Sequence, residues 1–248
     1  MTDQDERFRQ EVLEAFNAGL RNIYSEVDKV DVLVSINSFS FHFTNDISPR
    51  PSPESEEIQQ QLCVLWSMFL ETAKILEEGH PFQEKLLSLL LWTKEFDSLH
   101  RSIHCTETVA CAWDLYRFGE SLQATWEEVI NTGTTSQQCN LASFSAKVLS
   151  AGICRDEISL TALRYLREAL ETDEEAKTIA LLPAAAVWID DSRHMLLAFS
   201  VQNRFYGEQF KVHLATPGEL ARRANISQRG FSLKRWLFWR ERLKKTQS

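Results

Sequence analysis

Apolar residues recur at the spacing of an α-helix along most of this chain. Between residues 58 and 78 they would form one stripe along a helix: Leu62, Leu65, Trp66, Phe69, Ala73 and Leu76. Gly79 and Pro81 then end this helix and begin the next, which predicts an antiparallel hairpin. With 8 glycines and 6 prolines in 248 residues, a turn-rich β architecture is disfavoured. The pattern predicts an all-α fold, a single irregular bundle of about nine helices.

Residues 179–199 are apolar on nearly every side of the helix that their spacing predicts. A helix with this composition belongs in the interior of a helical protein, so we expect it to be central and buried. Pro183 is expected to kink or to start it, because proline lacks the amide hydrogen of a helix interior. The three alanines at 184–186 would let a neighbouring helix approach closely.

The first 57 residues follow a different pattern. Residues 5–20 have the spacing of a short amphipathic helix. Residues 30–43 alternate as a strand does, but the rest of the chain offers no partner strand, so we predict a helix that gives way to a loop. Residues 45–57 contain three prolines and three serines, which is typical of a flexible linker. We therefore predict an N-terminal helix and linker over 1–57, followed by a helical domain over 58–248.

The charge of the chain is unevenly distributed. Its net charge is −8, yet residues 221–248 carry nine Lys or Arg and one Glu, which leaves −16 on the rest. The start of the chain lacks the apolar run of a secretory signal, and the uncharged run at 178–189 is too short to span a bilayer. The five cysteines are odd in number and scattered, which is typical of reduced thiols. These features predict a cytoplasmic protein that does not enter a membrane.

The basic C-terminal segment combines arginines with aromatic side chains, a mixture that can also bind nucleic acid. Four of its residues share one helical face, with Leu233 and Leu237 beside them: Trp236, Trp239, Arg240 and Leu243. We interpret this face as a helix docked on the acidic body of the protein, and we predict no nucleic-acid partner. Helix caps are predicted at Ser159, at Thr216 and at Ser232.

Four segments of the chain resemble a known family. They are residues 140–144 (NLASF), 160–170 (LTALRYLREAL), 182–189 (LPAAAVWI) and the closing 230–242 (GFSLKRWLFWRER). Together they resemble an uncharacterised, mostly fungal helical family, a domain of unknown function, over roughly residues 58–244. The resemblance implies an all-α fold and a fungal source, and it supplies no functional residues.

Few residues point to chemistry. The cluster at 190–194 (DDSRH) pairs two carboxylates, as magnesium sites in helical terpene cyclases do, but it lacks a third carboxylate. His100 and His104 share a helical face and are followed by Cys105 and Cys111, without the spacing of a zinc site. We therefore predict neither a metal nor a cofactor. Three residues remain as catalytic candidates because each interrupts an apolar stretch: Asp114, Asp190 and His194.

Two functional hypotheses follow from the absence of catalytic motifs and the abundance of Trp, Phe and Leu. The first is a non-catalytic helical module that binds a partner protein or an apolar small molecule in a groove between helices. The alternative is a cofactor-free enzyme of fungal secondary metabolism, of the cyclase or isomerase type, with an aromatic pocket that stabilises a cation. A closed aromatic cavity with Asp or His on its wall favours the enzyme, whereas an exposed apolar groove over a solid core favours the module.

Overall fold

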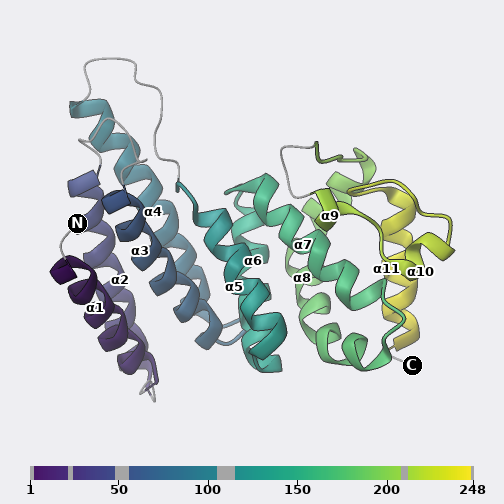
Figure 1. Cartoon of the computed structure of the whole chain (residues 1–248), viewed down its shortest axis with the longest axis horizontal. Helices are drawn as coiled ribbons and strands as arrows, with labels where there is room; N and C mark the ends of the chain where they lie inside the picture. Colours follow the sequence, from purple (N-terminus) through teal and green to yellow (C-terminus); the bar gives the residue numbers. More distant parts are fainter. Residues whose placement is uncertain (1–2, 22–24, 48–55, 105–114, 208–211, 247–248) are drawn as a thin grey trace. The chain divides into compact units, whose positions relative to one another are not determined.

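The computed structural model describes residues 3–21, 25–47, 56–104, 115–207 and 212–246 (Figure 1). All secondary structure within these ranges is helical, which confirms the all-α fold. The chain divides into two compact helical units, residues 1–122 and residues 123–248. α5 (Phe118–Thr132) begins in the first unit and ends in the second.

The first unit contains four long helices: α1 (Asp3–Arg21), α2 (Glu26–Ile47), α3 (Glu56–Ile75) and α4 (Pro81–His104). α3 contacts each of the other three, and α2 also contacts α4. The predicted hairpin of α3 and α4 is confirmed, with Gly79 at a φ of +74° and Pro81 as the first residue of α4. Trp66 is fully buried in this unit, and its indole N–H donates to the backbone oxygen of Tyr116 at 2.9 Å.

The predicted helix-to-loop transition within residues 30–43 is wrong, because α2 is one continuous helix from Glu26 to Ile47. Its apolar residues alternate in sequence because they occupy two faces of the helix. Leu33 and Ile36 are buried in the unit, whereas Val34 and Phe41 are exposed. The predicted linker at 45–57 lies mostly outside the described residues. The division at residue 57 stays a prediction.

The second unit is built around α8 (Glu175–Val201), which contacts α6 (Thr135–Ser150), α7 (Arg155–Leu170) and α11 (Leu233–Thr246). The short helices α9 (Val212–Ala215) and α10 (Glu219–Arg223) precede α11. The expected central helix is thus confirmed, and its buried side includes Ala184, Ala185 and Trp188. Pro183 lies inside α8, and the backbone departs from helical geometry at Ser192 instead (φ −122°, ψ 19°).

Only one of the three predicted caps forms. The Ser232 hydroxyl accepts from the backbone N–H of Arg235 at 3.2 Å, which confirms the cap of α11. The predicted cap at Thr216 is wrong, because Gly218 is the N-cap residue of α10. Ser159 lies inside α7, where its hydroxyl shares a 2.5 Å hydrogen bond with the Tyr206 hydroxyl. Burial raises the pKa of Tyr206 to about 12, so this pair stays neutral at neutral pH.

Candidate functional site

A groove of about 710 Å³ lies between α2 and α4 in the first unit. These two helices run in the same direction, since Lys29 contacts His80 near their starts and Phe41 contacts Phe96 further along. The wall of the groove is mainly apolar and aromatic, with side chains that include Val34, Phe41, Phe82, Leu89, Trp92 and Phe96. This volume is in the range of pockets that hold small molecules.

Aromatic rings dominate the far part of this groove. The ring centroids of Phe41 and Phe96 are 5.1 Å apart, and those of Trp92 and Phe96 are 6.4 Å apart in a stacked arrangement. Trp92 is 66% exposed and Phe41 is 55% exposed, although each is a large apolar side chain. Because water contacts these rings in the isolated chain, an apolar molecule that covered them would gain hydrophobic stabilisation.

A few polar groups interrupt the apolar wall. Thr44 and Thr93 are satisfied by their own helices, since each hydroxyl donates to the backbone oxygen four residues earlier. The Ser40 hydroxyl differs from them, because the side chain is only 5% exposed and has no hydrogen-bond partner among the described residues. Lys85 holds its ammonium group 4.2 Å from the centroid of the Phe82 ring.

The lining of the groove restricts its chemistry. Lys85 is the one ionisable side chain among the described residues that line it, which include no Asp, Glu, His or Cys. General acid–base catalysis usually needs such a group next to the reacting atoms. The described lining thus offers an apolar surface with a single ionisable group.

Neither Asp190 nor His194, two of the three predicted catalytic residues, lies in this groove. Asp190 and His194 are exposed on α8 in the second unit, and Asp114 lies outside the described residues. His100 and His104 belong to α4, while Cys105 and Cys111 lie outside the described ranges. Within the described part of the chain, no group of three or more His, Cys, Asp or Glu side chains is arranged to hold a metal ion.

Asp191, the neighbour of the predicted Asp190, makes the contacts in this part of α8. Its carboxylate accepts from the Ser143 hydroxyl at 2.6 Å, and the ammonium group of Lys147 donates to the same hydroxyl at 2.7 Å. A serine between a carboxylate and a lysine has the composition of an activated nucleophile. However, Ser143 is fully buried, so the cluster is better explained as a polar contact that joins α6 to α8.

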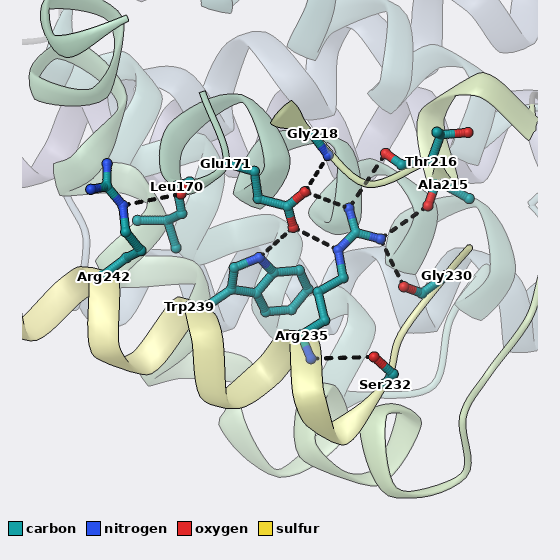
Figure 2. Close-up of polar contacts among 10 residues, drawn as sticks. All are labelled: Leu170, Glu171, Ala215, Thr216, Gly218, Gly230, Ser232, Arg235, Trp239 and Arg242. Carbon is teal, nitrogen blue, oxygen red and sulfur yellow. Dashed lines mark hydrogen bonds and ion pairs between the residues drawn. The ribbon is translucent and has the colours of Figure 1, made fainter. Parts of the chain in front are cut away.

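The second unit also contains a buried ion pair that fastens its C-terminal helix (Figure 2). Glu171 follows α7, and its carboxylate accepts from the Arg235 guanidinium at 2.6 and 3.0 Å. The indole N–H of Trp239 donates to the same carboxylate at 2.7 Å, and the backbone N–H of Gly218 donates at 2.5 Å. With four donors, the charge of a fully buried Glu171 is compensated.

The remaining donors of Arg235 are also occupied. One terminal nitrogen donates to the backbone oxygens of Ala215 and Gly230, at 3.0 and 2.8 Å, and the other reaches Thr216 at 3.5 Å (Figure 2). The guanidinium thus joins α7, α11 and the two loops before α11. We define Glu171, Arg235 and Trp239 as the C-terminal clamp.

Two glycines allow the backbone to approach the clamp. A Cβ on Gly218 would lie 2.7 Å from the Cβ of Glu171, so a larger residue would displace the chain from the carboxylate. Gly230 has a φ of +86°, and a Cβ there would lie 2.2 Å from the backbone oxygen of Arg204. Both positions therefore favour glycine for reasons of space, and Gly230 also for its backbone angle.

The predicted docking of the C-terminal helix on the protein's own core is confirmed, because Trp236 and Trp239 are buried. The predicted face is partly wrong. Arg240 is exposed, as are the flanking Leu233 and Leu237, whereas Arg235 is buried and was missed. Arg235 and Trp239 are four residues apart, so helical spacing already places them on the same face of α11. However, arginine is rarely buried without an acidic partner, and that partner was not known from the sequence.

Comparisons with known proteins identify the family of this chain. The family model described as "Protein of unknown function (DUF3632)" matches residues 66–243, which confirms the resemblance seen in the sequence. The chain is similar to "Oxopyrrolidines biosynthesis cluster protein G" of Penicillium oxalicum, with 25% identity over 221 residues. That match covers 77% of this chain and 61% of the relative. No solved structure matches the chain. Within the described residues, no helix is both long and apolar enough to cross a membrane.

Proposed function

This chain belongs to the family described as "Protein of unknown function (DUF3632)", and we propose a function for it. We propose that it is a non-catalytic helical module that binds an apolar small molecule. The single observation that carries this proposal is the groove between α2 and α4, with its exposed Trp92 and Phe41. Its wall resembles a ligand pocket, in which a mainly apolar surface carries a few polar groups that orient the bound molecule.

The process in which the module acts is proposed from its relative. The name of that relative assigns it to a biosynthesis cluster for oxopyrrolidines. This chain spans 61% of the length of that relative. We propose that the chain acts in fungal secondary metabolism, in the cytoplasm, where it holds an apolar intermediate or product. Lys85 is the one charged side chain among the described residues of the groove wall, which is consistent with such a molecule.

A cofactor-free cyclase or isomerase is the rival function. Its best support would be an acid or base aimed at the bound molecule, and the described groove lining offers only Lys85. The clamp and the Ser143–Asp191 contact both have their donors and acceptors engaged within the protein fold. The binding module therefore explains more of the observed geometry than the enzyme does.

The groove is tested with a neutral fluorescent probe, the methyl ester of cis-parinaric acid, titrated into the whole protein. We expect saturable binding of one probe per chain, measured by the rise in probe fluorescence. Replacing Trp92 or Phe41 with alanine should weaken binding about tenfold, since each change removes apolar contact area worth on the order of 1.5 kcal/mol.

The matched control is Leu237→Ala, which removes a similarly exposed apolar side chain from α11. This variant should bind the ester as the unaltered protein does. All three variants should keep the thermal stability of the unaltered protein within a few degrees, because none of the replaced side chains is buried. Equal affinities for the ester in all four proteins would rule out the groove as the site.

A further inference from the structure

We propose that the molecule held between α2 and α4 is an elongated organic acid, with its carboxylate at Lys85 and its apolar body along Phe41, Trp92 and Phe96. This inference rests on the proposed function, since it names the chemical class of the ligand for the same groove. It depends on two polar groups of the groove wall, Lys85 and Ser40, which have different surroundings.

Lys85 supplies the only positive charge among the described residues of the lining. No described carboxylate forms an ion pair with its ammonium group, which lies over the Phe82 ring at 4.2 Å from the centroid. An anion at this end of the groove would therefore gain a charge-assisted hydrogen bond without displacing an existing ion pair. A cationic ligand would be repelled there, and a neutral one would gain nothing from the charge.

Ser40 supplies the second polar point. Its side chain lines the groove and is almost fully buried, yet its hydroxyl has no hydrogen-bond partner among the described residues. A buried hydroxyl without a partner is unfavourable, and an oxygen atom on a bound molecule would relieve this cost. The ligand is accordingly expected to carry a hydroxyl or carbonyl group far from its carboxylate.

The two polar points set the length of the ligand. Ser40 precedes Phe41, whose ring contacts Phe96 on the facing helix. Phe96 comes eleven positions after Lys85 in α4, so the two residues are about 16 Å apart along the helix axis. The aromatic side chains line the groove between Lys85 and this far end. The groove therefore matches a long acid with an apolar middle and a polar far end.

The test compares cis-parinaric acid with its methyl ester, which differ in charge but share the same apolar chain. We expect the acid to bind about tenfold more tightly than the ester at neutral pH and low salt, with a difference that shrinks as salt rises. Lys85→Met should remove this preference and leave the affinity for the ester unchanged. Lys85→Arg should keep the preference, and Lys244→Met on the surface of α11 serves as the control.

The possible outcomes separate the two proposals. Equal binding of acid and ester to the unaltered protein would overturn the acid assignment and leave the binding module intact. Failure of both probes to bind would overturn both. A concentration-dependent dimer in sedimentation, dissociated by Trp92→Ala, would show that a second copy of the chain covers the groove and would also overturn the assignment. A hydroxylated long-chain acid that gained no affinity over its parent acid would contradict the role of Ser40.

Discussion

Removal of residues 231–248 is expected to abolish the folded state of the second unit. The truncation eliminates three buried aromatic side chains, Phe231, Trp236 and Trp239. Their burial stabilises the fold by on the order of 10 kcal/mol before entropy is counted, which is as large as the whole stability of a typical domain. The truncation also leaves Glu171 buried without Arg235. We expect loss of the cooperative thermal transition of this unit and aggregation of the chain.

The control for this experiment is a shorter truncation that removes only residues 244–248. Lys244 and Lys245 at the end of α11 are exposed. The shorter truncation should therefore melt within a few degrees of the full chain. A chain lacking residues 231–248 that kept the full melting temperature would contradict the docking of α11.

Arg235→Ala is expected to lower the free energy of unfolding by about 3–5 kcal/mol, since it leaves the buried carboxylate of Glu171 without its counter-charge. The backbone oxygens of Ala215 and Gly230 lose their donor in the same variant. The measurement is urea unfolding followed by circular dichroism, read as the midpoint at an unchanged slope.

Arg240→Ala is the matched control, because Arg240 is an exposed arginine on the same helix. It should change the free energy of unfolding by no more than about 0.5 kcal/mol. The double variant Glu171→Leu with Arg235→Met removes both charges, so it should recover part of the stability that Arg235→Ala loses. Similar losses for Arg235→Ala and Arg240→Ala would mean that the clamp does not stabilise the unit.

The sequence predicted the docking of the C-terminal helix but not the residues that hold it. Helical spacing places Trp236 and Trp239 on one face, and burial of that face follows from its apolar surface. The partner of Arg235 is Glu171, 64 residues earlier in the chain. Periodicity is a local property, so it carries no information about which distant carboxylate meets a given arginine. Among the many acidic residues of this chain, nothing in the sequence singles out Glu171.

The groove could not be recognised from sequence for a related reason. The alternating apolar residues of α2 resembled a strand because both faces of this helix carry apolar side chains. Ile36 is buried in the unit, whereas the exposed Val34 and Phe41 line the groove together with the buried Leu33. A helix with two apolar faces is expected where a helix has both a core and a ligand to cover. That explanation becomes available only once α4 is known to lie beside α2.

The catalytic candidates Asp190 and His194 stay predictions, and the structure shows why they interrupt an apolar stretch. Both residues lie on the exposed side of α8, where polar side chains are accommodated. Asp191 instead contacts a residue of another helix, Ser143. Helical periodicity gives no information about this contact, as it gives none about the C-terminal clamp. The backbone oxygen of Asp191, next to the kink at Ser192, also accepts from the Ser150 hydroxyl at 3.3 Å.

Photo-crosslinking tests directly whether the groove between α2 and α4 holds a small apolar molecule. A long-chain acid that carries a diazirine in its apolar middle is bound to the whole protein, irradiated and located by peptide mass spectrometry. Binding in the groove predicts labels on α2 near Phe41 and on α4 near Trp92, both removed by an excess of cis-parinaric acid. Labels confined to residues 123–248, or spread over the surface without competition, would contradict it.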